Sequence, residues 1–529
     1  MRKLGWTALA VVLLGACTQE AAEDAAGNGV ADSGATTDAA GAEAPATQTV
    51  STPDTVRGAE DSGEHGAEGA VHPPLDPYPS TYEPYASGAT LITGATILTG
   101  AGERIDNGSV LLEGGKISAI GAAGAVDAPA GANTIDAAGK WVTPGVIDIH
   151  SHLGDYPSPS TASTSDGNEA TAPNTAEVWT EHSVWPQDAG FTRALAGGIT
   201  SMQVLPGSAN LFGGRSVILK NVPSRTVQEM KFPGAPYGLK MACGENPKRV
   251  YGDKGGPSTR MGNFSHYRTA WIEASDYKKQ WDDYWKAYAK WAEKDNAKDD
   301  AEDEGAEDAP EAPSRNLKLE TLAGVLRGDI RVNMHCYRAD EMVQVMDMGK
   351  EFGYKVSTFH HAIEAYKVAD YLAENGVCAA MWADWWGFKL EAYDAVNENA
   401  ALVDAQANSC AIIHSDSATG IQRLNQEAAK AMAAGWRIGL EIAPEDAITW
   451  ITANPAKAMG VLDQTGTLEV GKMADVVIWN RNPFSVYAKA EQVFIDGAMM
   501  YDRSDPKRSP RMDFEIGQQD NQHTGGAGQ

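Results

Sequence analysis

Residues 142–152 read Val-Thr-Pro-Gly-Val-Ile-Asp-Ile-His-Ser-His, and the other candidate site residues of the chain can be arranged around the last three of them. Its apolar run, bounded by Pro-Gly and by polar residues, is typical of a short buried strand over 145–150. Residues two apart in a strand face the same side, about 6.6 Å apart, so His150 and His152 can reach one metal ion. Neutral imidazole is the commonest protein ligand of zinc-like metals. The pair alone is equally consistent with two surface histidines, so the rest of the chain must decide.

Strand-like and helix-like runs alternate between residues 143 and 460, as in parallel β/α folds. Once an insertion over about 263–315 is set aside, roughly 260 residues remain, which is typical of a (β/α)8 barrel. The insertion begins with regularly spaced Trp and Tyr residues, which favour a helix packed on the barrel over a ligand platform, and ends in an acidic run. We therefore predict an α/β fold of the (β/α)8 TIM-type, with strands over 145–150, 199–205, 216–219, 238–243, 331–335, 355–360, 377–381 and 411–415.

The two ends of the ordered chain share a different pattern. Short strand-like runs separated by Gly-rich turns occupy residues 88–142, and the same pattern returns over 461–503. We expect these two parts to form one small β-sandwich domain beside the barrel, followed by a tail over 504–529.

The amino terminus predicts export and a lipid anchor. A basic start and an apolar run over 4–15 are typical of a signal peptide and too short to span a bilayer. Residues 14–17, Leu-Gly-Ala-Cys, resemble the lipobox of bacterial lipoproteins, which predicts a lipidated Cys17 on the extracytoplasmic, periplasmic side, with Thr18 favouring the outer membrane. An ordinary secretory signal cut near Ala16 is the alternative. Residues 18–87 are rich in Ala, Gly, Thr, Asp and Pro, which predicts a disordered tether.

The net charge of −28 is concentrated in two segments. Residues 17–86 hold 13 acidic residues and one basic residue, and residues 292–313 hold 10 acidic and two basic residues. Such runs are typical of solvated polypeptide. The chain has no basic stripe that could hold phosphates, which argues against nucleic acid as a partner. The oligomeric state stays open.

Four cysteines follow Cys17 and could pair in an oxidising compartment. Each lies in an apolar, strand-like run and they are far apart in sequence, so we expect buried free thiols, although the sequence leaves pairing open. They are Cys243, Cys336, Cys378 and Cys410.

Metal-binding residue types close several of the predicted strands. In a barrel, the carboxyl ends of the strands meet at one mouth, so these side chains should gather there. Taken singly, each has a structural explanation: a histidine can cap a turn, a lysine can be solvated, and Asp416 can begin a helix. Together they predict a shared metal site built from His150, His152, Lys240, His335, His360 or His361, and Asp416.

Six motifs in order resemble the amidohydrolase superfamily, and within it the imidazolonepropionase-like metal-dependent hydrolases. The resemblance covers residues 88–503 and implies hydrolysis of an amide-like, lactam or amidine bond by metal-activated water. The motifs are PGVIDIHSH, NMHCYRAD, HHAIEAYK, HSDS, ANPAKAMG and GTLEVGKMADVV, which begin at residues 144, 333, 360, 414, 453 and 466.

The resemblance carries over unevenly to individual residues. His150, His152, His335 and Asp416 match the family's metal ligands, and the sixth strand selects His361 over His360. Lys240 resembles a lysine that carries a bridging carbamate between two metals, while Glu245 is the competing bridging carboxylate.

The resulting hypothesis is a metal-dependent hydrolase of C–N bonds in a small amide, peptide-like or cyclic amide substrate. One or two divalent ions, Zn²⁺ foremost, would make hydroxide available near neutral pH, with Asp416 as general base and a second metal or His361 polarising the carbonyl. A single-metal deaminase is the first alternative. A lipoprotein that keeps the barrel as a non-catalytic binding module is the second.

Substrate-facing residues are the least determined part of the prediction. Arg338 and Lys389 could hold a carboxylate, although surface or structural roles are as consistent with the sequence. Three further histidines, His182, His266 and His414, stay open, and His414 shares the face of Asp416.

Overall fold

A computed structural model of the chain describes residues 70–158, 160–296, 308–506 and 508. The predicted signal peptide, Cys17, most of the predicted tether, the acidic end of the insertion and most of the predicted tail lie outside these residues. Among the described helices, none has both the length and the apolar character that a membrane span requires.

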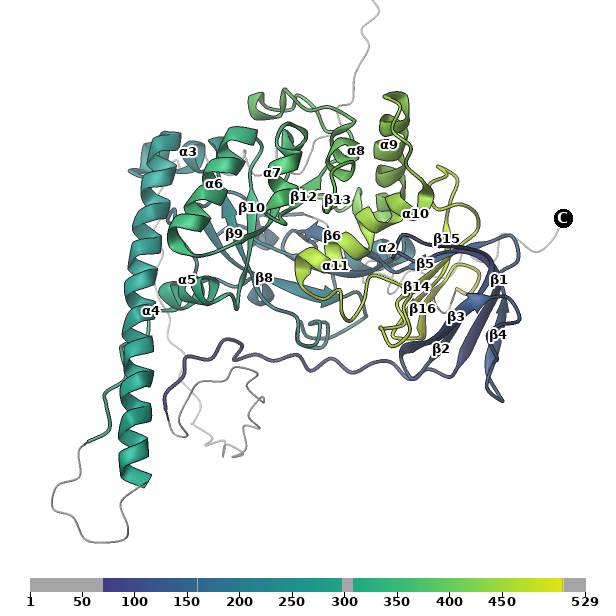
Figure 1. Cartoon of the computed structure of the whole chain (residues 1–529), viewed down its shortest axis with the longest axis horizontal. Helices are drawn as coiled ribbons and strands as arrows, with labels where there is room; N and C mark the ends of the chain where they lie inside the picture. Colours follow the sequence, from purple (N-terminus) through teal and green to yellow (C-terminus); the bar gives the residue numbers. More distant parts are fainter. Residues whose placement is uncertain (1–69, 159, 297–307, 507, 509–529) are drawn as a thin grey trace, which may run out of the picture. The chain divides into compact units, whose positions relative to one another are not determined.

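Eight strands form a sheet that curves into a nearly closed barrel, as predicted (Figure 1). The backbone N–H of Asp416 donates to the carbonyl oxygen of His150, 3.0 Å away, and so links the last strand to the first. In chain order and in sheet order the strands are β6 Val146–Ser151, β7 Ile199–Val204, β8 Phe212–Lys220, β9 Gly238–Ala242, β10 Arg331–His335, β11 Val356–His360, β12 Cys378–Met381 and β13 Ala411–Ile413.

The third strand corrects the expectation of an all-parallel barrel. β8 is longer than the predicted 216–219 and runs antiparallel to both β7 and β9. Its direction follows from its connection: only residues 205–211 join β7 to β8, and a parallel crossover needs about a dozen residues or more. The other neighbouring pairs in this sheet are parallel.

Helices cover the outside of the barrel (Figure 1). They form where apolar residues recur at helical spacing, and several begin or end at capping residues: the Asn316 side chain accepts from the N–H of Leu319, and Gly328 ends the same helix at φ 90°. The α-helices are α2 Ala189–Ala196, α3 Glu245–Tyr251, α4 Arg260–Asn296, α5 Leu317–Arg327, α6 Ala339–Phe352, α7 Ala369–Glu374, α8 Asn399–Asp404, α9 Leu424–Arg437, α10 Pro444–Ala447 and α11 Ala453–Met459.

The aromatic-rich insertion forms α4, a helix of 37 residues. Its buried Trp271 packs against Tyr354 of the barrel wall with ring centroids 4.4 Å apart. Farther along, Trp281 is buried in a cluster that includes Ala323 of α5. The aromatic residues of α4 therefore pack the helix on the barrel, as the sequence favoured.

Strands from both ends of the ordered chain pair in one second sheet of mixed direction. β5 connects the two parts because it pairs with β1 on one side and with β14 on the other. A separate hydrophobic cluster, with Ile92 and Phe494 among its members, fills this region. The strands are β1 Thr90–Leu98, β2 Arg104–Glu113, β3 Lys116–Ala122, β4 Asn133–Asp136, β5 Trp141–Pro144, β14 Val476–Trp479, β15 Ala490–Ile495 and β16 Ala498–Asp502.

A buried ion pair joins the second sheet to the barrel. Lys220, at the end of β8, is fully buried, and its Nζ lies 2.7 Å from Asp496 Oδ2 and 3.3 Å from Asp475 Oδ1. Tyr82 Oη donates to Asp496 from the segment before β1. Each buried carboxylate thus has a charged partner, which a buried charge requires.

Part of the predicted tether belongs to the folded structure. Residues 70–88 run as irregular backbone along the barrel, where Asp76 Oδ1 lies 2.9 Å from Lys231 Nζ. The carbonyl oxygen of Leu75 accepts from the Arg215 guanidinium at 2.8 Å. Buried basic residues of the barrel therefore hold this segment.

The four cysteines form two disulfides, so the expectation of free thiols is wrong. Cys243 follows β9 and Cys336 follows its neighbour β10, with Cα atoms 5.2 Å apart. Cys378 and Cys410 lie at the beginnings of the neighbouring strands β12 and β13, with Cα atoms 4.6 Å apart. Both separations suit a disulfide. The sequence did not predict these disulfides because the paired cysteines are 93 and 32 positions apart. They become neighbours only when the strands pair.

Candidate metal and catalytic site

A cluster of histidines and one aspartate fills the carboxyl ends of the barrel strands. Strand pairing sets the positions: His335 is in register with His360 on β11, and Lys240 of β9 is in register with Asn333 of β10. The buried members of the cluster are His150, His335, His360, His361, His414, Lys240 and Asp416.

Asp416 meets both histidines of the first strand. Its Oδ1 lies 3.2 Å from His152 Nε2 and 3.5 Å from His150 Nε2. One ligand atom from each of these three residues falls within 4.8 Å of the others. Two imidazoles and a carboxylate at such separations can hold one divalent cation.

A second group of three buried histidines shares His150 with the first. One ring nitrogen from each of His150, His361 and His414 lies within 4.8 Å of the other two. His361 Nε2 also lies 3.8 Å from Asp416 Oδ2, so the two groups are adjacent. Among the described residues, the cluster therefore offers ligand atoms for one ion or for two neighbouring ions.

Hydrogen bonds from outside the cluster orient several of its rings. The carbonyl oxygen of Leu205 lies 2.8 Å from His152 Nδ1, so this nitrogen carries the proton and leaves Nε2 with a lone pair toward Asp416 and His150. Ser208 Oγ lies 2.7 Å from His335 Nδ1. Both ring nitrogens of His360 have partners within the protein: Nδ1 lies 2.9 Å from His150 Nδ1, and Nε2 lies 3.1 Å from Asn333 Oδ1.

Burial keeps these histidines neutral. The pKa values of His150, His335 and His361 are lowered well below the ordinary value, first by desolvation and then by nearby charges such as that of Lys240. Burial also lowers the pKa of His414 to about 3. A neutral imidazole offers a lone pair, which is what a metal requires.

Unpartnered nitrogens test whether a metal fits. Both ring nitrogens of His414 and Nδ1 of His361 are buried without a hydrogen-bond partner. Buried polar atoms without partners are uncommon and need an explanation, such as an ion that accepts the one lone pair of a neutral ring. The donor set of imidazoles and a carboxylate matches the ligands that zinc and similar divalent ions prefer.

Asp416 combines a buried position in the cluster with an unusual backbone conformation. Burial raises the pKa of its carboxyl to about 7, while the charges of Lys240 and Lys389 oppose that rise. Asp416 adopts φ 47° and His361 adopts φ 56°, in the left-handed region that non-glycine residues rarely occupy. Such conformations gather at functional sites, where the surrounding structure holds them.

The two candidate bridging residues lie in different surroundings. Lys240 is fully buried in β9, and its Nζ donates to the carbonyl oxygen of Pro206 at 2.9 Å. Its charge contributes to the lowered pKa values of His150, His335 and His361. Glu245 begins α3, keeps 32% of its side chain exposed, and lies 3.9 Å from Lys389 Nζ. This geometry favours Lys240 as the residue beside the cluster.

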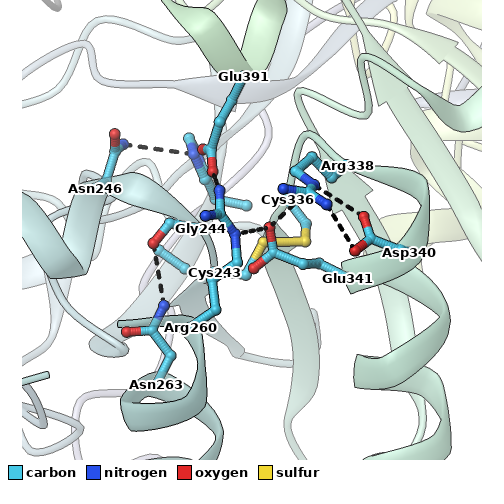
Figure 2. Close-up of a disulfide and its surroundings, with 12 residues drawn as sticks. Cys243, Gly244, Asn246, Arg260, Asn263, Cys336, Arg338, Asp340, Glu341 and Glu391 are labelled. Carbon is cyan, nitrogen blue, oxygen red and sulfur yellow. Dashed lines mark hydrogen bonds and ion pairs between the residues drawn. A yellow bond between two sulfur atoms is a disulfide. The ribbon is translucent and has the colours of Figure 1, made fainter. Parts of the chain in front are cut away.

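The two candidate substrate contacts also separate. Lys389 lies near the cluster, since its charge lowers the pKa of His335, and its Nζ donates to Asn246 Oδ1 at 3.2 Å. Arg338 instead makes two hydrogen bonds of 2.9 Å to Asp340 at the start of α6 (Figure 2). A pairing with Asp340 occupies the guanidinium that a substrate carboxylate would need.

The three histidines left open by the sequence have different positions. His414 joins the cluster, whereas His182 is exposed beside Trp179, and His266 of α4 lines a separate cavity of about 340 Å³.

Two residues that support the cluster had not been predicted. They are Asp148, whose carboxylate accepts from Ser415 Oγ and from the N–H of His150, and Trp382, whose ring stacks on His361 with centroids 4.2 Å apart. Strand alternation held a signal for Asp148, which lies two residues before His150 on the same face.

Comparisons with known proteins agree with this geometry. The model of the amidohydrolase family matches residues 141–500. Amidohydrolase tasK of Hapsidospora irregularis is 30% identical over 410 residues, which are 75% of this chain and 40% of that protein. The chain thus spans less than half the length of that relative. Imidazolonepropionase of Brucella suis matches only 36 residues, 7% of this chain and 9% of that enzyme, at 56% identity.

A solved structure extends the likeness to three dimensions. The amidohydrolase from Thermotoga maritima MSB8 superposes with a TM-score of 0.68 and 33% identity, over 78% of this chain and 100% of that one. The barrel, the cluster at its strand ends and the family match lead to one conclusion. The chain belongs to the amidohydrolase family and has a TIM-type barrel fold.

Proposed function

We propose that the protein is a metal-dependent hydrolase that cleaves a C–N bond in a small amide, peptide-like or cyclic amide substrate. The observation that carries the proposal is the buried cluster around Asp416, in which neutral histidines present unpartnered ring nitrogens. Histidine nitrogens and carboxylate oxygens are among the ligands that catalytic zinc sites use.

His150, His152, His335, His361 and Asp416 are the residues that would hold the metal, with His414 as a further ligand. A divalent cation, Zn²⁺ in our proposal, would supply Lewis-acid chemistry and make water nucleophilic near neutral pH. Asp416 would accept the proton of the attacking water and return it to the leaving nitrogen. A pKa near 7 suits both transfers, because a group that gains and loses a proton works best near the operating pH.

The neighbouring residues would divide the remaining tasks. His361 would polarise the substrate carbonyl as charge develops on its oxygen. Lys389, on the loop after β12, would hold a polar or anionic end of the substrate, and its proximity to Asn246 and to the pKa-shifted His335 supports that position. Arg338 is a weaker candidate because of its pairing with Asp340.

If the Lys240 side chain is modified to a carbamate, it would bridge two ions in a dinuclear form of the site. Its complete burial beside the histidines supports this role, and the partial exposure of Glu245 disfavours the alternative bridge. Without a carbamate, the site would hold one metal, as in the deaminase alternative.

Metal content per chain tests the proposal directly. We would measure bound metal by elemental analysis in the wild-type protein and in the Lys240→Ala and Glu245→Ala variants, with hydrolysis of a panel of small amides and cyclic amides as a second readout. Two equivalents that fall towards one or zero in Lys240→Ala, with Glu245→Ala unchanged, are expected. The two variants serve as matched controls for each other.

The other outcomes separate the alternatives. One equivalent that neither substitution changes would favour a single-metal deaminase, and release of ammonia would then identify it. Failure to bind metal after reconstitution would overturn the proposal and leave the non-catalytic binding module.

The cellular location and the domain organisation are proposed from the sequence. We propose that Cys17 is lipidated and that the protein is anchored on the periplasmic side, at the outer membrane. The lipobox-like sequence of residues 14–17 supports this proposal. Cys17→Ser should move the protein from the membrane fraction to the soluble fraction. We likewise propose that the second sheet, which both chain ends build, is a β-sandwich domain.

A further inference from the structure

Residues that come after the first barrel strand line a large cavity. This cavity shares a wall with the metal cluster. Its volume is about 770 Å³, within the range of small-molecule pockets. Pro206 lines the cavity, and the carbonyl oxygen of the same residue accepts the hydrogen bond from Lys240. Asp155 also lines it, and the N–H of Asp155 donates to the carbonyl oxygen of His152 at 3.1 Å. Two residues of the cavity wall are thus bonded to two residues of the cluster.

The buried wall of the cavity carries a carboxylate that lacks a full set of partners. Asp155 is 0% exposed. Its Oδ1 accepts from Ser183 Oγ at 2.9 Å, whereas Oδ2 is buried without a hydrogen-bond partner. A cation beside a buried carboxylate favours its charged form. The wall of the cavity therefore contains a buried carboxylate with one unpartnered oxygen, and such a group is suited to pair with a cation.

Three further acidic residues line the same cavity, and none of the residues that line it is Lys or Arg. Asp166 and Glu169 are exposed at its edge. Glu177 Oε1 lies 3.7 Å from Lys318 Nζ, while its Oε2 is buried without a partner. The cavity wall therefore has an excess of negative charge that the surrounding side chains only partly offset.

We propose that this cavity is a specificity subsite for an organic cation, namely the ammonium or guanidinium group of a substrate held at the metal cluster. The inference rests on the proposed hydrolase function, which it makes more specific. The volume argues for an organic group rather than a bare metal ion, because a metal site needs several oxygens around one point. Here the fully buried carboxylate is that of Asp155, and two of the other acids lie at the edge.

Binding of a small probe tests the subsite apart from catalysis. We would titrate the purified full chain with n-butylguanidinium and with uncharged n-butylurea, which has a similar shape, by calorimetry. The cation should bind and the urea should not. Loss of a buried charge partner should weaken binding in Asp155→Asn by at least about 30-fold. Asp384→Asn, which removes an exposed acid outside the cavity, is the matched control and should leave binding unchanged.

A second variant guards against misfolding, because Asp155 is buried. Asp166 is exposed, so the Asp166→Asn variant should fold normally. We expect it to bind n-butylguanidinium about two- to fivefold more weakly than the wild-type protein. Equal binding of n-butylguanidinium and n-butylurea would overturn the inference. So would calcium binding that is lost in Asp155→Asn while n-butylguanidinium does not bind, since the cavity would then be a metal site.

Paired substrates separate this inference from the proposed function. We would compare amides that carry a guanidinium group with the matching ureas, by kcat/KM in the metal-loaded enzyme. Hydrolysis without preference for charge, together with no cation binding, would overturn the subsite and leave the hydrolase. Cation binding that depends on Asp155, in a protein that binds no metal and hydrolyses none of the amides, would overturn the hydrolase and support the cation preference of the cavity.

Discussion

The backbone N–H of Asp416 donates to the carbonyl oxygen of His150, 3.0 Å away, while the side chains of the same two residues approach to 3.5 Å. One contact links the last strand of the barrel to the first, and the other forms part of the candidate metal site. Beneath them, Ser415 donates through both its side chain and its backbone to the carboxylate of Asp148. The backbone contact therefore holds Asp416 in position independently of any metal.

Asp416→Asn should separate catalysis from metal binding. The amide keeps an oxygen ligand and the backbone contact to His150, but it cannot accept a proton near neutral pH. We expect kcat to fall by about 10²- to 10⁴-fold, the usual contribution of a general base. Elemental analysis should find metal content close to wild type. Asp384→Asn is the control, and an Asp416→Asn enzyme that keeps its activity would contradict the role.

Much of the fold and of the candidate site follows from the sequence because strand ends are local features. The apolar runs before His150, His335 and His360 mark the strand ends directly, and a barrel topology is enough to bring those ends together. The match of the amidohydrolase family model to residues 141–500 is consistent with that reasoning.

The remainder depends on pairing, which local patterns do not encode. The antiparallel direction of β8 follows from its short connection to β7, residues 205–211. The sequence of this connection has no feature that distinguishes it from other loops. The disulfides join residues on neighbouring strands that are distant in sequence, and segment 70–88 is ordered by contacts with buried basic residues. The sequence left the role of His414 open, because only the folded barrel places its ring 5.1 Å from that of His150.

Lys220→Met should destabilise the fold strongly. The substitution leaves Asp475 and Asp496 buried beside each other without their shared cation, so we expect a loss of about 3–5 kcal/mol in the free energy of unfolding. Urea unfolding followed by circular dichroism measures the loss. Lys279→Ala removes the exposed pair with Asp283 on α4 and should cost at most about 0.5 kcal/mol. Equal effects of the two substitutions would mean that the buried pair does not hold the second sheet to the barrel.

Removal of either disulfide should also lower stability. The bridges close chain segments of 93 and 32 residues, and chain-entropy arguments give about 4.7 kcal/mol for the longer segment and about 3.7 kcal/mol for the shorter one, through the unfolded state. Double substitutions to alanine, Cys243 with Cys336 and Cys378 with Cys410, should lower the urea midpoint. Mass spectrometry after alkylation without reductant should find no free thiol among these four residues in the wild-type protein, and alkylation of all four would contradict the pairing.

The buried His414 should make the metal-free protein sensitive to acid. Its folded-state pKa of about 3 lies below the value of about 6.5 expected in the unfolded chain. The unfolded state therefore binds the proton more readily, and stability is lost as the pH falls through about 6.5. Between pH 7.5 and 5, wild type should lose about 2 kcal/mol more than His414→Gln, which cannot be protonated. Urea unfolding at both pH values measures this difference. His182→Gln, which replaces an exposed histidine, should follow the wild-type profile. A His414→Gln protein with that same profile would show that His414 already shares a proton or a ligand in the metal-free state.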